Sequence, residues 1–445
     1  MYKLEPARTN TLLAASEHPG GEIGVDRLVI QGGRRLHGRI KSSGAKNAVL
    51  KLMAASILAN RPCLIRNVPS KISDVEVMIG VLQGLGIKVT WEDANCLRLD
   101  PRGELGFHAP DHLVREMRAS LQVIGPLLGR RGRALLYQPG GCVIGQRPID
   151  LHIKGFTALG AKVSEEHGYI EVKADRLRGA EIHLDFPSVG ATENVMAAAI
   201  LAEGTTIIRN AAKEPEIIEE QNFYNRLGAR IRGAGTDCLR IDGVSALNDR
   251  EIDYAVIPDR IEIGTFMMAA AITAGDVTID DVIPEHVEAV TAKLRETGAE
   301  VIPGEDSIRV IGSTRARPTD VTVLPHPGFP TDLQSPMVAL LTRAEGTSIL
   351  TDHVFEARFR YVDELLRMGA NVRVEGRSAI VKGTPRLSGA EVVATDLRAG
   401  AALAIAGLAA EGQTVVQGTK HLDRGYERME DKLRALGAEI ERIID

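Results

Sequence analysis

A cysteine stands among glycines in the stretch PGGCVIGQRPIDLH, residues 139–152. Gly140, Gly141 and Gly145 surround Cys142 and are typical of a loop. A free cysteine is usually a small buried hydrophobe, but a thiol on a loop can act as an acid and its thiolate as a nucleophile. Arg147 adds a cation to the same segment. The stretch predicts thiol chemistry beside an anion, with an ordinary buried cysteine as the alternative.

A second set of residues recurs at a fixed distance before a turn. Four members precede a glycine by the same number of positions, and the fifth precedes Arg61 by one position more: Arg118 before Gly132, Gly190 before Gly204, Asp332 before Gly346, Arg398 before Gly412, and Lys46 before Arg61. We expect these equivalent positions in the first turn of buried helices, where unpaired N–H groups favour anions. With Arg147 they predict a site for phosphates and carboxylates. The alternative is that the charges only decorate solvated helix ends.

Asp332 is the exception in this set, because it is an acid where related positions carry Lys or Arg. A carboxylate among cations has a depressed pKa and stays ionised, and it can accept a proton from a hydroxyl group. The alternative is that Thr331 or Asp332 caps the N-terminus of a helix.

The elements that must position these residues follow a sixfold repeat with a nearly constant period. A helix end of the form long aliphatic residue, Gly, strand occurs at Gly86, Gly160, Gly228, Gly298, Gly369 and Gly437. A second marker, in which an apolar helix ends in a turn and a β-branched strand, keeps the same period. We predict six copies of one α/β unit, each with two helices and several short strands.

The two helices of each unit differ in polarity. The first, as in NVMAAAILA and GAALAIAGLAA, is apolar nearly all round and should be buried on every side. The second, as in RMEDKLRALG, is amphipathic and should lie on the surface. Three buried helices surrounded by strands, built twice, give two similar three-unit domains of the α/β class rather than a doubly wound sheet.

Composition excludes several classes of protein. The 445 residues carry a net charge of −5, which argues against a nucleic-acid-binding surface. The four cysteines show no CxxC spacing and the histidines no paired metal spacing, so we expect a reduced cytoplasmic chain without a metal. No apolar run is long enough to span a bilayer, and residues 1–26 are expected to form a flexible extension. Phosphate-loop, dinucleotide, zinc-protease and nucleophile-elbow motifs are absent from the sequence.

Ten motifs together resemble the UDP-N-acetylglucosamine 1-carboxyvinyltransferases, a family of enolpyruvyl transferases. They are SGAKNA (43–48), MRAS (117–120), PGGCVIGQRPIDLH (139–152), SVGAT (188–192), NAAKEPEI (210–217), PDRIEIGTF (258–266), FPTDLQ (329–334), VFEARF (354–359), ATDLRA (394–399) and HLDRGYERMEDKLRALGA (421–438). The likeness covers about residues 27–445. It implies two inside-out α/β barrels, one of residues 46–256 with the Cys142 lid loop and one of residues 27–45 and 257–445, with the active site in the cleft between them.

The resemblance also implies roles for individual residues. Lys46, Arg147 and Arg424 would hold the phosphate of phosphoenolpyruvate, and Arg398 and Arg424 its carboxylate. Asp332 would take the proton from the 3-hydroxyl of UDP-N-acetylglucosamine, and Cys142 would protonate the methylene carbon. The same thiol can add to the substrate's C2 and is the group that the epoxide antibiotic fosfomycin alkylates.

The remaining expected site residues bind the sugar nucleotide or brace the site. Asn47 would contact the sugar, and Arg358 and Asp396 would brace the closed site. The uridine diphosphate part would lie against Arg118, Arg147, Pro148, Ile149, Asp150, Leu151, Ser188, Val189, Gly190 and Val354. No cofactor or metal is expected, and the sequence does not report the oligomeric state.

Two alternatives stay open at this point. One is an enolpyruvyl transferase for a different nucleotide acceptor. The shikimate-3-phosphate enzyme shares the fold but lacks the cysteine loop, which weighs against that enzyme's acceptor. The other is a non-catalytic paralogue that only binds a nucleotide sugar, although Lys46, Cys142, Asp332 and Arg424 are all present. The chain departs from the family in its N-terminal extension, in Asp185-Phe186-Pro187, and in the wording of VFEARFRYV.

Overall fold

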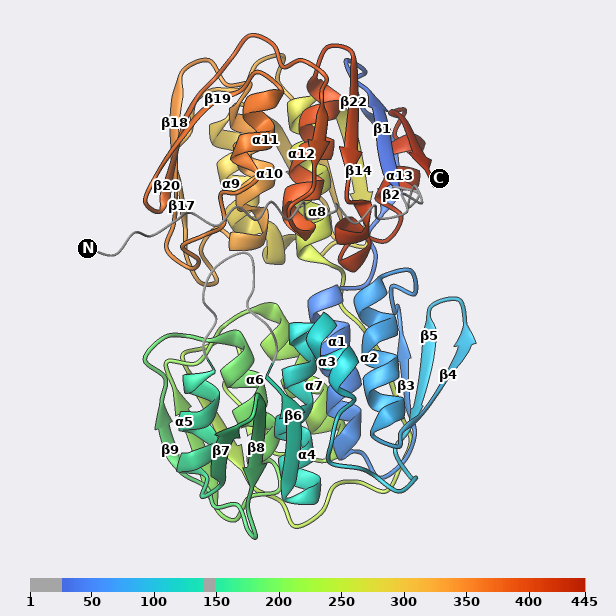
Figure 1. The fold of residues 1–445 in the computed structure, drawn as a ribbon, viewed down its shortest axis with the longest axis vertical. Coiled ribbons are helices and arrows are strands. Elements are labelled where there is room, and N and C mark those ends of the chain that lie inside the picture. The colour runs from blue at the N-terminus through green and yellow to red at the C-terminus, as the bar shows by residue number, and fades with distance from the viewer. Residues whose placement is uncertain (1–25, 139–148, 445) are drawn as a thin grey trace, which may run out of the picture.

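The computed structural model describes residues 26–138 and 149–444. Within these ranges two bodies lie one above the other along the long axis of the molecule (Figure 1). One hydrophobic core contains residues between Ala45 and Val256, and the other contains residues of Leu28–Ile40 and of Ile261–Ile440. We propose that each core is one domain, so that the chain begins in the second domain, builds the first and then returns. The expected extension, residues 1–26, lies outside the described residues except for Asp26.

The described strands form six sheets, three around each core. In the first core the sheets are, in strand order, β13 (Ile252–Ala255), β3 (Cys63–Arg66), β5 (Cys96–Asp100) and β4 (Lys88–Asp93); β6 (Arg133–Tyr137), β8 (Tyr169–Lys173) and β7 (Lys162–Glu166); and β11 (Ile231–Arg232), β12 (Cys238–Asp242), β10 (Thr205–Arg209) and β9 (Glu181–His183).

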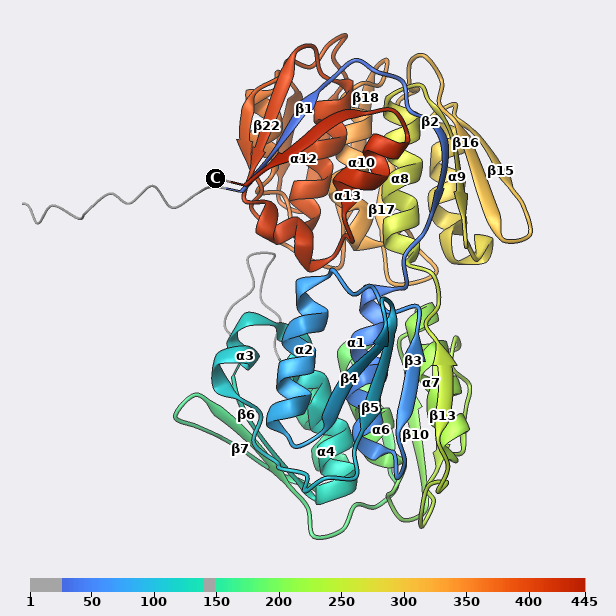
Figure 2. The same ribbon diagram turned by 90° about the vertical axis from the view of Figure 1, so that its right-hand side faces the viewer.

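The second core repeats this plan. Its sheets are β15 (Glu300–Pro303), β16 (Ser307–Ile311), β14 (Asp276–Asp280) and β2 (His37–Lys41); β17 (Val321–Val323), β18 (Thr347–Asp352), β20 (Ser378–Lys382) and β19 (Asn371–Glu375); and β21 (Glu391–Val393), β22 (Gln413–Gln417), β1 (Arg27–Gln31) and β23 (Glu439–Ile443). Figure 2 shows the N-terminal strand β1 beside β22.

Each sheet follows one pattern of pairing. A strand that follows a buried helix pairs antiparallel with one neighbour and, in five of the six described sheets, parallel with another, as β3 does with β5 and β13. The sheet of β6 has three strands, and a single parallel bridge between His108 and Leu135 stands where the parallel strand would be. The predicted sixfold repeat is therefore confirmed at the level of sheets.

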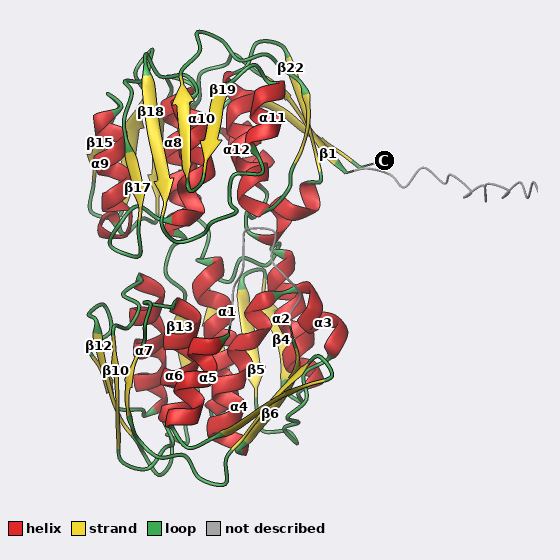
Figure 3. Ribbon diagram, turned by 60° about the vertical axis from the view of Figure 1, so that its left-hand side comes forward, coloured by secondary structure: helices red, strands yellow, loops and turns green. Residues whose placement is uncertain are grey.

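Helices fill the space between the sheets (Figure 3). The first helix of each unit is deeply buried: α1 (Lys46–Ala55), α4 (Ile124–Arg131), α6 (Val189–Ala199), α8 (Arg260–Ile272), α10 (Gln334–Leu341) and α12 (Leu397–Ala409). The second keeps one exposed face: α2 (Ser73–Gly84), α5 (Asp150–Ala158), α7 (Pro215–Leu227), α9 (Glu288–Glu296), α11 (Val362–Arg367) and α13 (Met429–Ala435). A further short helix, α3 (Asp111–Glu116), precedes α4, and 3-10 turns η1 (Ser56–Leu58) and η3 (Pro284–Val287) follow α1 and precede α9. The burial of the first helix and the exposed face of the second helix in each unit agree with the polarity of the sequence.

The glycine that ends the second helix of each unit has a positive φ. The angle lies between 82° and 105° at Gly86, Gly160, Gly228, Gly298, Gly369 and Gly437. An L-residue with a side chain rarely adopts this left-handed conformation, so glycine is the residue that lets each helix turn sharply into its strand. No helix among the described residues is long and apolar enough to cross a membrane.

Candidate active site

Two cations from the two different cores share one buried carboxylate. Lys46, the first residue of α1, places its Nζ 2.8 Å from Oδ2 of Asp74, which lies in the first turn of α2. Arg424, the last residue of the 3-10 turn η5 (Thr419–Arg424), places its Nε 2.9 Å from Oδ1 of the same carboxylate. The Asp74 side chain is only 4% exposed, whereas that of Arg424 is 39% exposed. The cluster therefore joins the two cores and leaves the guanidinium accessible.

The pKa values of this cluster reflect burial and charge together. Burial lowers the pKa of Lys46, and the charges of Arg398 and Arg424 lower it further, against the opposing effect of Asp74. Burial would raise the pKa of Asp74, but Lys46 and Arg424 outweigh it and hold that pKa below its ordinary value. Asp74 thus stays ionised and keeps Lys46 charged in a site that otherwise disfavours an ammonium group.

A second cluster surrounds Asp332, which lies in the 3-10 turn η4 (Thr331–Leu333). Arg358 donates from Nη2 to Oδ1 at 2.7 Å, and Arg398 donates from Nη2 to Oδ2 at 2.8 Å. Burial opposes ionisation, but the two guanidinium groups hold the pKa of Asp332 well below its usual range. The depressed pKa that the sequence predicts is confirmed. The N-cap alternative is wrong, because neither η4 nor α10 has a side-chain cap and the carboxylate contacts arginines instead.

A chain of hydrogen bonds orients Arg358 from behind. Its Nη1 donates to Thr331 Oγ1 at 2.8 Å, and that hydroxyl donates to Oδ2 of Asp352 at 2.8 Å. Asp352 is fully buried and also accepts from the backbone N–H of Val354, at 2.8 Å, and of Phe355. Val354, an expected nucleotide contact, is therefore tied through Asp352 to the arginine that contacts Asp332.

The two clusters form one charged region at the junction of the cores. Asp259 accepts from the backbone N–H of Lys46 at 3.1 Å and also caps α8, where it accepts from Ile261 and Glu262. The charge of Arg398 acts on Lys46, and Asp259 acts on Arg398. Cations from both cores thus gather in one region, which is the arrangement that anionic substrates require.

Part of the expected nucleotide set lies at the start of α6. Ser188 caps this helix by accepting from the N–H of Ala191 at 3.3 Å. A Cβ on Gly190 would lie 3.1 Å from Nε2 of Gln122 and 3.3 Å from the ring of His152, so this position accommodates glycine best. His152 follows Asp150 and Leu151 on α5, and Arg118 begins the 3-10 turn η2 (Arg118–Val123). Segments distant in sequence, Ile149–His152 and Ser188–Gly190, are therefore neighbours.

Other expected residues have different surroundings. The Asp396 carboxylate accepts from the N–H groups of Arg398 and Ala399 and caps α12, so it orients the helix that carries Arg398. The carbonyl of Asn47 accepts from Lys51 Nζ at 2.7 Å. Cys142, Arg147 and Pro148 lie outside the described residues, and their roles stay predictions.

The helix starts agree with the sequence in part. Lys46, Gly190 and Arg398 lie in the first turn of an α-helix, whereas Arg118 and Asp332 lie in 3-10 turns before α4 and α10. Pro126 and Pro336 explain the difference, because a proline has no N–H to donate to the carbonyl one helical turn earlier, at Gln122 and Asp332. The α-helix can therefore begin only just before each proline.

Sequence reasoning missed Asp74, Asp352 and Thr331. An acid at the start of an amphipathic helix, such as Asp74, is common on protein surfaces because it complements the helix dipole. Its sequence context therefore carried no signal of a catalytic environment.

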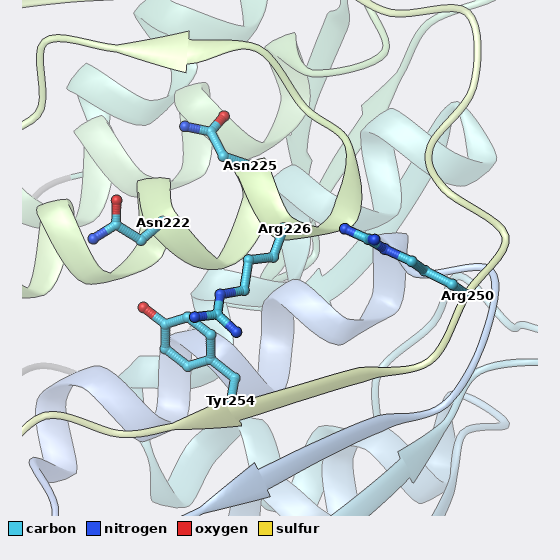
Figure 4. Close-up of a pocket in the computed structure, with 5 residues that line it drawn as sticks. All are labelled: Asn222, Asn225, Arg226, Arg250 and Tyr254. Carbon is cyan, nitrogen blue, oxygen red and sulfur yellow. The ribbon is translucent and has the colours of Figure 1, made fainter.

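A separate surface hollow lies between the C-terminal half of α7 and β13. It has a volume of about 490 Å³ and is lined by Asn222, Asn225, Arg226, Arg250 and Tyr254 (Figure 4). None of the expected site residues lines it. Among the described residues, no group of three or more His, Cys, Asp or Glu side chains is arranged to hold a metal ion.

Comparison with known proteins places this geometry in a family. The model of the family EPSP synthase (3-phosphoshikimate 1-carboxyvinyltransferase) matches residues 30–433. The chain belongs to the EPSP synthase family. Two solved structures of this fold are EPSP synthase from Acinetobacter baumannii, with a TM-score of 0.69 and 18% identity over 94% of this chain and 100% of that one, and the enolpyruvyl transferase NikO from Streptomyces tendae, with a TM-score of 0.84 and 27% identity over 95% and 100%.

More similar relatives within the EPSP synthase family bear one name. UDP-N-acetylglucosamine 1-carboxyvinyltransferase 2 of Carboxydothermus hydrogenoformans is 53% identical over 423 residues, 95% of this chain and 100% of that protein. UDP-N-acetylglucosamine 1-carboxyvinyltransferase 1 of Halalkalibacterium halodurans is 53% identical over 95% of both chains. The resemblance that the motifs indicate is thus confirmed.

Proposed function

We propose that this protein transfers the enolpyruvyl group of phosphoenolpyruvate to the 3-hydroxyl of UDP-N-acetylglucosamine and releases phosphate. The observation that carries the proposal is the convergence of Lys46 and Arg424 from two domains next to the Asp332–Arg358–Arg398 cluster. Such a site offers cations for a phosphate and a carboxylate, and a carboxylate for a hydroxyl proton. The names of relatives more than 50% identical support the same reaction.

Asp332 acts as the base in this mechanism. While two arginines hold its oxygens, its low pKa makes it a weak proton acceptor. The carboxylate of phosphoenolpyruvate competes for Arg398, and each guanidinium contact that leaves Asp332 raises its pKa. The binding of phosphoenolpyruvate therefore strengthens the base, which takes the proton as the sugar oxygen adds to C2 of phosphoenolpyruvate.

Lys46 and Arg424 hold the phosphate, with Arg147 as a third cation. Addition to C2 gives a tetrahedral ketal, and loss of phosphate restores the enol ether. Cations on the phosphate oxygens stabilise the charge that develops on the leaving group. Lys46 also sits at the start of a ten-residue helix, whose N-terminal dipole favours the same anion.

Cys142 supplies the proton to C3 of phosphoenolpyruvate. Its thiol is the acid, and its thiolate is the nucleophile that fosfomycin alkylates. We expect Cys142→Ala to abolish or severely reduce phosphate release, because the change removes the thiol that donates the proton. We expect Cys142→Asp to retain turnover and resist fosfomycin, since a carboxyl can donate a proton but its carboxylate is a far weaker nucleophile toward an epoxide than a thiolate. Fosfomycin sensitivity unchanged in the Asp variant would contradict the assigned role.

UDP-N-acetylglucosamine is favoured over another nucleotide acceptor. Relatives named UDP-N-acetylglucosamine 1-carboxyvinyltransferase are 51–53% identical to this chain. The reaction would be the first committed step of peptidoglycan synthesis, and we place it in the cytoplasm, where both substrates are made.

One assay tests the proposal. Purified protein is incubated with phosphoenolpyruvate and UDP-N-acetylglucosamine, and inorganic phosphate is measured. Release that requires both substrates is the expected result. Turnover with a different nucleotide sugar alone would favour the alternative acceptor, and nucleotide binding without turnover would favour the non-catalytic paralogue.

A further inference from the structure

The chain crosses between the two domains twice, and the crossing segments lie against each other. Ala45 donates its N–H to the carbonyl of Ile257 at 2.8 Å, and Asp259 donates to the carbonyl of Ser43 at 2.9 Å. A Cβ on Gly44 would come within 1.8 Å of the carbonyl oxygen of Asn67, so a side chain does not fit there. Lys46 follows directly, and its position depends on this pair of segments.

One hydrogen bond joins this crossing to the segment that carries Arg424. Ser43, which shortly precedes Lys46, donates from Oγ to Oε2 of Glu427 at 2.9 Å. Glu427 shortly follows Arg424 in the chain. Its other oxygen, Oε1, accepts from the backbone N–H of Lys71 at 3.1 Å, close in sequence to Asp74. Glu427 thus touches the neighbours of all three members of the Lys46–Asp74–Arg424 cluster.

Further contacts fix the direction of this bond. Lys432 donates from Nζ to Ser43 Oγ at 2.8 Å and to Oε1 of Glu262 at 2.6 Å. The backbone N–H of Ser43 donates to Oε2 of Glu262 at 2.6 Å. Because the ammonium group can only donate, the Ser43 hydroxyl accepts a hydrogen bond from Lys432 and donates one to Glu427. Each of these side chains has a hydrogen-bond partner in the network, which favours one geometry.

The Arg424 segment is held on its other side as well. Tyr426 is buried, and its hydroxyl lies 2.9 Å from Thr265 Oγ1. A Cβ on Gly425 would approach the Leu397 side chain to 2.6 Å, so the backbone packs closely on the start of α12. The segment therefore packs against the second domain. Glu427 links it to the crossing and, beside the Arg424–Asp74 ion pair, to the first domain.

We propose that Ser43 and Glu427 are positioning residues that set the separation of the two phosphate-binding cations, Lys46 and Arg424. The inference rests on the proposed function, in which those cations hold the phosphate of phosphoenolpyruvate. Neither residue touches the substrate in this proposal. The Ser43–Glu427 bond joins two segments from different parts of the chain, each just beside one of the cations in sequence, and no covalent link fixes the distance between them.

The Ser43–Glu427 bond matters for catalysis through the geometry that it imposes on the two cations, not through its own strength. Preorganised charges stabilise a leaving phosphate only when they converge on its oxygens. A displacement of about 1 Å in such a site can cost on the order of a hundredfold in rate. Breaking the link would let Lys46 and Arg424 move apart, while the residues that bind the nucleotide, at the start of α6, keep their places.

The test compares Glu427→Ala, Ser43→Ala and the double variant by steady-state kinetics. We expect kcat/KM for phosphoenolpyruvate to fall about tenfold to a hundredfold, with KM for UDP-N-acetylglucosamine within about twofold of wild type. Inhibition by inorganic phosphate should weaken in parallel. The double variant should have about the same kcat/KM as the more impaired single variant, since both single changes remove the shared Ser43–Glu427 bond. Glu439→Ala, which removes an exposed ion pair to Arg34, is the matched control and should leave all constants unchanged.

Other outcomes would overturn the inference. Kinetic constants of Glu427→Ala equal to those of the wild type would contradict it. Equal rises in KM for both substrates, together with a lowered unfolding midpoint, would also contradict it, because they indicate a structural role only. If Glu427→Ala fails to fold, Ser43→Ala decides alone, since it removes one hydroxyl. Failure of the proposed function is distinguishable, because the wild-type protein itself would then release no phosphate.

Discussion

Asp74 is the residue on which the charge balance of the site depends. It is the buried counter-charge of Lys46, and it also meets Arg424 from the other domain. Substrates would bring several negative charges into the same region, so the carboxylate must compete with them for both cations. Its contribution is to keep Lys46 protonated before those anions arrive.

Replacing Asp74 by Asn should shift the pH dependence of the reaction. Burial already lowers the pKa of Lys46 from its ordinary value, and Asp74 is the strongest influence that raises it. Removing the carboxylate lowers that pKa further, so Lys46 loses its proton at a lower pH. We expect the alkaline limb of kcat/KM for phosphoenolpyruvate to move to lower pH by about one unit or more, as measured by phosphate release across the neutral and alkaline range.

A matched control separates this effect from loss of charge in general. Asp253→Asn removes an exposed ion pair with Arg66 in the same domain and should leave the pH profile unchanged. An alkaline limb in Asp74→Asn at the wild-type pH would show that Lys46 does not depend on this partner.

The sequence predicted the charged residues of the site better than their partners. Lys46, Asp332 and Arg398 stand out because counting from the turns puts them at equivalent places in related units. Asp74 and Asp352 do not, because their importance comes from packing against segments that are far away in the chain. The ion pairs of Asp332 with Arg358 and Arg398, in place of a helix cap, are likewise tertiary contacts that local spacing does not encode.

At the level of elements, the repeat could be predicted from the sequence, but the pairing of the parallel edge strands could not. The glycine turns and the two kinds of helix follow from local chemistry, and all six turn glycines have the expected positive φ. The parallel edge strands come from elsewhere, because β2 pairs with β14 and β13 with β3 although the members of each pair are far apart in the sequence. The local sequence of Ile252–Ala255 does not predict that this strand pairs with Cys63–Arg66.

Helix α7 contains a buried acid that gives a testable pH dependence of stability. Glu219 accepts from the N–H of Ile257 and from the hydroxyl of Tyr254, both at 3.1 Å, and burial raises its pKa to about 7. A carboxyl whose pKa is raised in the folded state contributes its full stabilisation of that state at pH values below its pKa in the unfolded chain. This contribution is lost as the pH rises through about 7. Glu219→Gln, which resembles the protonated form, should escape that loss.

We therefore expect Glu219→Gln to gain stability relative to wild type as pH rises from about 5 to about 8.5, by about 1–3 kcal/mol in the free energy of unfolding. Urea denaturation at several pH values measures the difference. Glu165→Gln, an exposed change on β7, is the control and should give no such trend. A pH-independent difference between Glu219→Gln and wild type would show that Glu219 is not protonated in the folded state.

At the scale of the whole molecule, charged contacts join the two cores. Besides the Asp74 and Glu427 contacts, Arg260 at the start of α8 meets Glu216 at the start of α7, with Nε 3.0 Å from Oε1. Both side chains are nearly buried, at 11% and 5% exposed. A buried pair of this kind is screened little by salt, and breaking it by removing one partner is costly. It therefore couples the stability of one domain to that of the other.

Arg260→Met should uncouple the domains. Burial opposes ionisation of Glu216, and Arg260 now holds the pKa of that carboxyl below its ordinary value. Without Arg260 the pKa rises, so the variant should lose about 3–5 kcal/mol at about pH 8 and less at about pH 5, where the carboxyl is protonated. Scanning calorimetry should show two transitions in place of a more cooperative one. Arg260→Met combined with Glu216→Leu should recover most of the stability, since no charge is left buried, but should still unfold in two steps. A single transition in that double variant would mean that packing, rather than this ion pair, couples the domains.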